Sequence, residues 1–190
     1  MKQFYRLQPE KNKYMYFELD AYDLLETLGG DFDITTFGES KKDIWKPVKG
    51  KFYSSEDTSI LIPDITIWSS NLLILNEKAY DALSDKLSHL GEFLDVTVES
   101  TPYYLFNIMN QLDNKVIDND KTEQALFKGQ VVGLKTLGFK ADSIKDKNLL
   151  FKIDYDNGVD LFCTDEFKSM VENFRLTGLA YHTKLAESPI

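Results

Sequence analysis

Two stretches of this chain repeat one order of local signals, and this repetition limits the folds that the chain can adopt. Each stretch holds an apolar run, a capping residue, a helix with one apolar face, a glycine and a further strand. The first cap is Asn76 and the second is Thr164. An apolar strand and a one-faced helix bury each other. The pattern predicts an α+β fold in which two similar amphipathic helices, over about 77–90 and 165–175, pack on a shared sheet.

The two stretches are related by a shift of 87 residues, which places Leu72 on Val159. Only the glycines, Gly91 and Gly178, are identical in the aligned set, so two ordinary strand–helix–strand units stay an alternative to an internal repeat. Between two apolar runs, Asp156-Asn157-Gly158 is typical of a tight hairpin turn. We therefore expect the sheets to be mixed but mainly antiparallel.

The first 58 residues carry weaker signals. Asp20 can cap a short N-terminal helix that runs to Leu28 and stops at Gly29. Four segments are predicted as strands: Phe4–Leu7, Tyr14–Leu19, Ile44-Trp45 and Lys51–Tyr53. With 190 residues, the chain has the length of one domain. We expect a single domain over 1–190, in which 1–58 either joins an α+β core over 59–185 or forms a smaller N-terminal lobe.

The residues that catalysis and metal binding need are scarce. The two histidines, His89 and His182, lie far apart and outside any metal-binding motif, and the single cysteine, Cys163, cannot build a thiolate site. No nucleophile elbow, phosphate-binding loop or dinucleotide fingerprint occurs. The acidic clusters at 118–120 and 154–158 lack the ligand spacing of a calcium loop. The sequence therefore predicts a protein that is not an enzyme and that uses no cofactor or metal.

Charge and hydropathy exclude further classes of partner. The chain has 22 basic and 31 acidic side chains, which gives a formal net charge of −9. Direct binding of nucleic acid needs clustered Lys and Arg, so it is not expected. No apolar run approaches the ~20 residues of a membrane span, and the first residues do not resemble a secretory signal. A single cysteine suits a reducing compartment, so we expect a cytoplasmic protein.

Most of the negative charge lies near the N-terminus. Residues 14–40 contain seven acidic side chains, no Lys or Arg, and several aromatic residues. One interpretation is a solvated helix face with acidic turns. The other is a docking surface for a basic protein, in which charge speeds association and aromatic side chains supply affinity. Its predicted partner-binding residues are Asp20, Asp23, Glu26, Asp31 and Asp33.

Short motifs over about 60–185 resemble a bacterial immunity-protein family that was long described as a domain of unknown function. They are Pro63-Asp64-Ile65, Leu73–Tyr80, Tyr103–Asn107, Leu112-Asp113, Leu161–Phe167 and Leu176–Leu179. The closing order of strand, Thr-Asp, aromatic-bearing helix, Thr-Gly and strand is similar to the end of that family. Cys163 stands where a small or branched residue is more typical, and the first 60 residues have no counterpart. The resemblance implies structural roles for Thr164, Phe167 and Gly178 and transfers no catalytic residue.

The resemblance implies a function in polymorphic toxin systems. A member of the family is expected to bind a cognate toxin domain and to neutralise it by occluding its active or substrate-binding site. One alternative is a small hydrolase that uses a carboxylate pair drawn from Asp20, Asp23, Asp31 and Asp33, which needs one raised pKa in a pocket. Another is an adaptor or self-associating module, including a homodimer formed through an edge strand.

Overall fold

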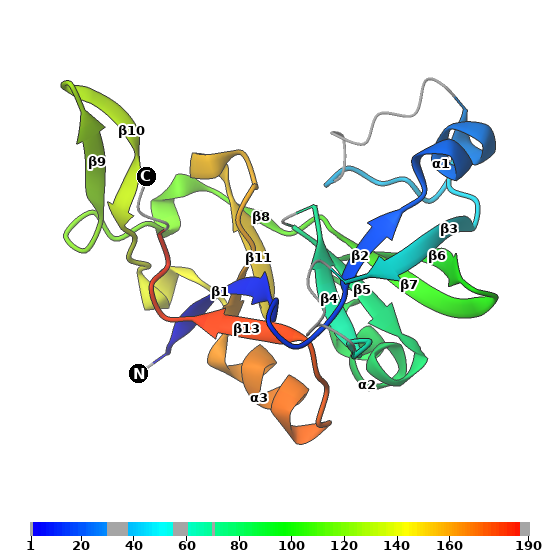
Figure 1. The fold of residues 1–190 in the computed structure, drawn as a ribbon. Helices are drawn as coiled ribbons and strands as arrows, with labels where there is room; N and C mark the ends of the chain where they lie inside the picture. Colours follow the sequence, from blue (N-terminus) through cyan, green and yellow to red (C-terminus); the bar gives the residue numbers. More distant parts are fainter. Residues whose placement is uncertain (1, 30–37, 55–60, 70, 187–190) are drawn as a thin grey trace.

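The structure is a computed structural model that describes residues 2–29, 38–54, 61–69 and 71–186. Within these residues the chain forms two large sheets, a separate two-stranded ribbon and three α-helices (Figure 1). Most neighbouring strands are antiparallel, and β3–β6 and β8–β11 are parallel. The predicted α+β class with mixed, mainly antiparallel sheets is confirmed.

The larger sheet has six strands in the order β2-β3-β6-β7-β5-β4. Its strands are β2 (Tyr16–Leu19), β3 (Val48–Tyr53), β4 (Ile65–Trp68), β5 (Leu72–Asn76), β6 (Gly91–Val98) and β7 (Thr101–Ile108). The long β6–β7 hairpin and the apolar strand β5 form the centre of this sheet. Their buried side chains face the core on both sides of the sheet.

The second sheet has five strands in the order β13-β1-β12-β11-β8. Its strands are β1 (Phe4–Pro9), β8 (Gln111–Leu112), β11 (Leu150–Ile153), β12 (Phe162–Thr164) and β13 (Leu179–His182). The predicted turn at Asp156-Asn157-Gly158 connects β11 to β12, and Asn157 adopts a left-handed conformation there. β1 lies between strands from the C-terminal part of the chain, whereas β2 and β3 extend the six-stranded sheet. The first 58 residues thus contribute strands to both sheets.

The three helices are α1 (Ala21–Leu28), α2 (Glu77–Leu87) and α3 (Asp165–Asn173), and their N-caps are Asp20, Asn76 and Thr164. The prediction that α2 and α3 share one sheet is wrong. The helix α2 follows a strand of the six-stranded sheet, and α3 follows a strand of the five-stranded sheet. They meet instead in one core cluster, where Leu83 of α2 and Phe167 of α3 are fully buried. The likeness of the two units stays a prediction.

Two local predictions are corrected. Ile44-Trp45 forms a turn and not a strand, because the backbone N–H groups of both residues donate to the carbonyl oxygen of Lys41. Val159 lies outside β12 and is exposed, so the apolar run before Thr164 is shorter as a strand than its composition suggested.

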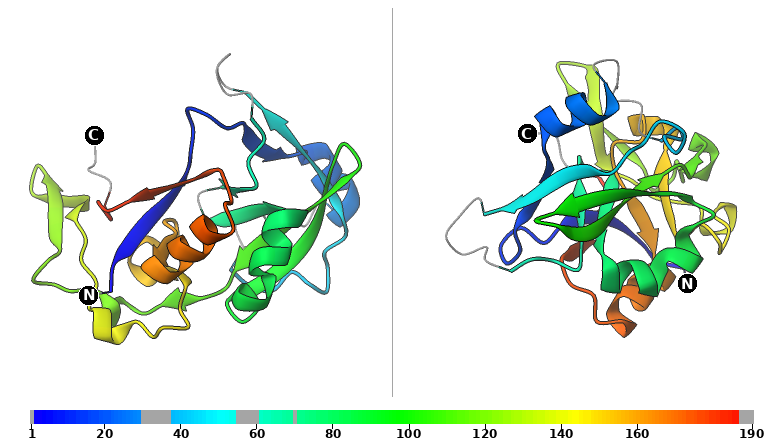
Figure 2. Two further views of the ribbon diagram at one scale, coloured as in Figure 1. Left: turned by 90° about the horizontal axis from the view of Figure 1, so that it is seen from below. Right: turned by 90° about the vertical axis from the view of Figure 1, so that its right-hand side faces the viewer.

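The ribbon β9–β10 was not predicted from the sequence. β9 (Glu123–Phe127) and β10 (Gln130–Thr136) pair only with each other among the described strands. Figure 1 and the left view of Figure 2 show this hairpin standing away from both large sheets. Leu134 at its base reaches a second core cluster around Phe139, Phe151 and Phe162.

Candidate docking surface

The helix α1 is held in place by the two aspartates at its start. The carboxylate of Asp20 accepts hydrogen bonds from the backbone N–H groups of Tyr22 and Asp23, both at 3.0 Å. The carboxylate of Asp23 accepts one from the backbone N–H of Lys49 at 2.6 Å and lies 3.1 Å from Lys49 Nζ. Partial burial works in the opposite direction, but these bonds keep the pKa of Asp23 below its ordinary value. Asp20 therefore caps α1, and Asp23 ties the helix to β3.

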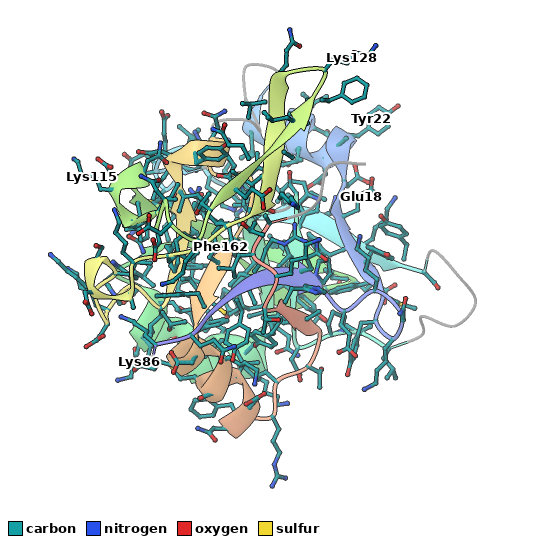
Figure 3. All side chains as sticks on the ribbon, turned by 90° about the vertical axis from the view of Figure 1, so that its left-hand side faces the viewer. Glu18, Tyr22, Lys86, Lys115, Lys128 and Phe162 are labelled. Carbon is teal, nitrogen blue, oxygen red and sulfur yellow. The ribbon has the colours of Figure 1, made fainter. Side chains whose placement is uncertain are left out.

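The outer face of α1 presents an apolar and acidic strip made of Tyr22, Leu25 and Glu26. These residues follow the i, i+3, i+4 spacing of one helix face. The side chain of Tyr22 is 87% exposed and that of Leu25 is 53% exposed, while Leu24 on the opposite face is buried. Figure 3 shows Tyr22 projecting from the rim of the molecule. Tyrosine is among the side chains that most often supply the binding energy of a protein interface.

The five predicted partner-binding residues have different places in the structure. Asp20 caps α1, Asp23 ties it to β3, and Glu26 lies on its exposed outer strip. Asp31 and Asp33 lie outside the described residues. Lysines of β3 offset part of the acidity, since Lys49 pairs with Asp23 and Lys51 Nζ lies 3.4 Å from Glu18 Oε2. The sequence could not show this pairing because the lysines follow the acidic stretch and reach it only through the β2–β3 pairing.

A recess lies between the two sheets, where residues of β1, β2, β3 and β4 line it. It has a volume of about 440 Å³. Tyr16 and Tyr53 stack at its wall with ring centroids 5.7 Å apart, and Trp68 also contributes to the lining. Two acids, Glu18 and Asp160, line it as well, and Arg6 lies 3.6 Å from the carboxylate of Asp160. The recess is open to solvent and aromatic, which suits an inserted side chain of a protein partner.

The motif residues that carry the family resemblance lie in the scaffold. The carboxylate of Asp64 accepts hydrogen bonds from Asn76 Nδ2, Lys78 Nζ and both the N–H and the hydroxyl of Thr177, each at 3.0 Å. Asp64 thereby ties the start of β4 to the N-terminus of α2 and to the loop before β13.

The residue after Thr177, Gly178, has a φ of +112°. A Cβ atom at Gly178 would lie 2.4 Å from the carbonyl oxygen of Ile65, so the close approach requires glycine.

A second motif residue, Asn107 of β7, fixes the segment that precedes β3. Its side chain is fully buried, accepts a hydrogen bond from the N–H of Gly38 at 2.8 Å, and donates to the carbonyl oxygen of Glu39 at 2.8 Å. It also donates to Glu92 Oε1, which accepts from the N–H of Lys41. Asn107 is thus satisfied within the fold, and its role is structural.

The described residues offer little acid–base or metal chemistry near this surface. They contain no group of three or more His, Cys, Asp or Glu side chains that could hold a metal ion. Burial raises the pKa of Cys163, whose thiol is fully buried. Elsewhere, burial raises the pKa of Asp156 and lowers that of Lys152. The carboxylate of Asp156 is occupied by the N–H groups of Gly158 and Asp160, at 3.0 and 2.8 Å, so its hydrogen-bonding partners are those of a turn.

Comparisons with known proteins leave the family of this chain open. A scan against protein-family models finds no match, and a search of curated proteins also finds no match. Within the described residues, no helix is both long and apolar enough to cross a membrane.

Proposed function

We propose that this chain is a cytoplasmic, non-enzymatic immunity protein that binds a basic bacterial toxin domain and occludes its active or substrate-binding site. The observation that supports this most directly is the outer strip of α1. Tyr22 and Leu25 are exposed side chains on a helix that Asp20 caps and Asp23 ties to β3. An ordered helix that exposes an aromatic anchor loses little conformational entropy when it binds.

The acidic residues around the strip have a kinetic role in this proposal. Glu26 is exposed beside Tyr22 and Leu25, and Glu18 lies on β2, the strand that precedes α1. An acidic field steers a basic partner toward the strip and raises the association rate, and the buried aromatic contact then slows dissociation. Screening by salt reduces the first effect and leaves the second largely unchanged.

The remaining parts of the fold act as scaffold in this proposal. We also propose that α2 and α3 are the similar amphipathic pair that the spacing predicted, with α1 as the separate N-terminal helix. Their buried faces meet in one core, which keeps the sheet under α1 rigid. The resemblance to the immunity-protein family supports the same division, because its motifs fall on Asp64, Asn107 and Thr177 and not on α1.

The carboxylate-dependent hydrolase has less support. Asp20 is engaged as a helix cap, and hydrogen bonds from Lys49 hold the pKa of Asp23 low. A general acid needs the opposite shift. Both carboxylates are therefore occupied by donors from the fold itself.

The test is a pull-down of the tagged chain from the lysate of its own cell, at low and moderate salt. We expect one stoichiometric basic protein that is toxic when expressed alone. The double variant Tyr22→Ala/Leu25→Ala should abolish its recovery, and Glu26→Lys should slow association. Phe174→Ala is the matched control, because Phe174 is a half-exposed aromatic residue at the end of α3. Equal recovery by all variants would contradict the proposed surface.

A further inference from the structure

The hairpin arm, defined as residues 123–136, carries features that the proposed function does not use. Its turn has Lys128 at φ 50° and Gly129 at φ 80°. Two central residues with positive φ define the type I′ turn, whose twist matches that of paired strands. At its base the Thr136 hydroxyl accepts from the N–H of Glu123 at 3.0 Å, and Leu134 enters the core. The arm is therefore an ordered projection of the fold.

The far half of the arm is apolar and solvent-exposed. Leu126 and Phe127 are 64% and 63% exposed, and Val131 and Val132 of β10 are about half exposed. Leu126 and Val131 are opposite each other in the register and so share one face of the ribbon, and an exposed apolar pair of this kind is typical of an interaction site. A two-stranded ribbon is also only marginally stable alone, whereas three or more strands support one another. The arm thus gains from additional strands.

The two edges of the arm differ. β10 has register shifts at Val131/Gly133 and at Leu134/Thr136, and such bulges disrupt edge pairing. Because the turn has two residues, the residues that flank it form a hydrogen-bonded pair, and every second residue of β9 does the same. Phe127, Ala125 and Glu123 therefore direct their backbone N–H and C=O groups toward β10. The backbone groups of Gln124 and Leu126 consequently point away from β10. Figure 1 shows β9 on the side of the arm that faces away from the body.

The charges at the ends of β9 favour a second copy of the same strand in antiparallel orientation. Glu123 stands at its start and Lys128 follows its end, where Figure 3 shows this lysine at the tip of the arm. The carboxylate of Glu123 is already paired within the arm, since Lys135 Nζ lies 2.8 Å from Glu123 Oε1. An antiparallel copy places this neutralised end beside the other copy's Lys128, whereas a parallel copy would place the two Lys128 side chains together. The edge therefore avoids a like-charge contact only in the antiparallel orientation.

We propose that this protein forms a homodimer through β9. The two arms join as one four-stranded sheet with the order β10-β9-β9-β10. Gln124 of each copy pairs with Leu126 of the other, and the two-fold axis passes between the two Ala125 residues. This pairing satisfies the outward N–H and C=O groups of both residues in both copies. The contact is the same on both subunits, so it closes at two copies.

Disulfide trapping tests the orientation and the register together. Residues that face each other at a non-hydrogen-bonded position have Cβ atoms about 4.5–5.5 Å apart, close to the distance that a disulfide spans. The Ala125→Cys variant should form a covalent dimer when treated with oxidised glutathione. The native Cys163 is fully buried and does not interfere. Val132→Cys on β10 is the control and should crosslink at least about tenfold more slowly.

Sedimentation velocity over a concentration series tests the contact without a covalent bond. The wild-type chain should show a reversible monomer–dimer equilibrium. Leu126→Pro removes an outward N–H and keeps the donors to β10, and Leu126→Lys keeps the backbone but charges the edge. Each should raise the dimer Kd at least about tenfold, which is about 1.4 kcal/mol, and Phe174→Lys should not. A wild-type monomer at every concentration, whether or not the arm binds another protein, overturns the proposal. So does a dimer that survives Leu126→Lys.

Discussion

Replacing Asp64 by alanine should destabilise the fold strongly, although Asp64 is not part of the proposed docking surface. The side chain of Asp64 is 16% exposed and accepts four hydrogen bonds at 3.0 Å from Asn76, Lys78 and Thr177. A hydrogen bond to a charged group stabilises a fold by roughly 1.5–3 kcal/mol. The four bonds share one carboxylate and are not additive, and the ion pair with the half-exposed Lys78 contributes under about 1 kcal/mol.

From these terms we expect Asp64→Ala to lower the free energy of unfolding by about 3 kcal/mol at neutral pH. For a chain of this length, such a loss lowers Tm by roughly 6–12 °C. Urea denaturation followed by circular dichroism measures the first quantity, and a thermal melt measures the second. The matched control is Asp146→Ala, because Asp146 is a 96% exposed carboxylate that pairs with Lys2, and its loss should leave Tm unchanged.

The pH dependence gives a second check on the same residue. Burial opposes ionisation of Asp64, but the hydrogen bonds from Asn76, Lys78 and Thr177 keep its pKa below the ordinary value of 3.8. A carboxyl group with a lowered folded pKa contributes stability above the unfolded pKa and loses it as the pH falls through the folded value. The difference between wild type and Asp64→Ala should therefore shrink below about pH 4. A loss under about 1 kcal/mol at neutral pH, or a difference that stays constant into acid, would refute the reasoning.

Three further perturbations follow from the structure. Gly178→Val should lower the free energy of unfolding, measured by urea denaturation, by at least about 3 kcal/mol, because its Cβ would lie 2.3 Å from Pro63 Cβ at a φ of +112°. Gly129→Ala is the control and should lower it by only about 1 kcal/mol, because the space around Gly129 is open. Lys152→Met should equal or exceed wild type in stability at neutral pH, because burial lowers the pKa of Lys152. The free energy of unfolding of wild type should rise relative to that of the variant as the pH approaches the unfolded lysine pKa of about 10.4. A variant that is less stable than wild type at neutral pH would contradict this prediction. A thiol-specific reagent should modify Cys163 only in urea, because burial encloses the thiol and raises its pKa; reaction of the native chain would show that the site opens.

Signals that depend on neighbouring residues could be read from the sequence. Asp20, Asn76 and Thr164 precede runs with helical spacing, and the structure places the three N-caps there. The turn at Asp156-Asn157-Gly158 was found for the same reason, because the residues that demand a left-handed conformation are adjacent.

Features that depend on distant segments could not be read in this way. The prediction of one shared sheet failed because strand partners come from remote parts of the chain, as β1 does between β12 and β13. The hairpin arm was missed since its turn is Lys128-Gly129, in which lysine gives no turn signal of its own. The predicted docking residues were chosen by charge alone. Lys49 reaches Asp23 only in the folded sheet, so the sequence did not reveal that Asp23 is an anchor. The exposure of Tyr22 and Leu25 could not be read either, because both belong to the apolar helical spacing that they form with Leu24 and Leu28.

The place of β1 has a consequence for synthesis of the protein on the ribosome. Phe4 pairs with Thr164 and Leu7 with Tyr181, so β1 can find both of its partner strands only after residues up to 182 have been made. The six-stranded sheet needs no segment beyond β7 to complete its strand order and can assemble earlier. During that interval the apolar side of β1 is uncovered and open to chaperones. Because its pairings are the longest in sequence, the five-stranded sheet should set the rate of the last folding step.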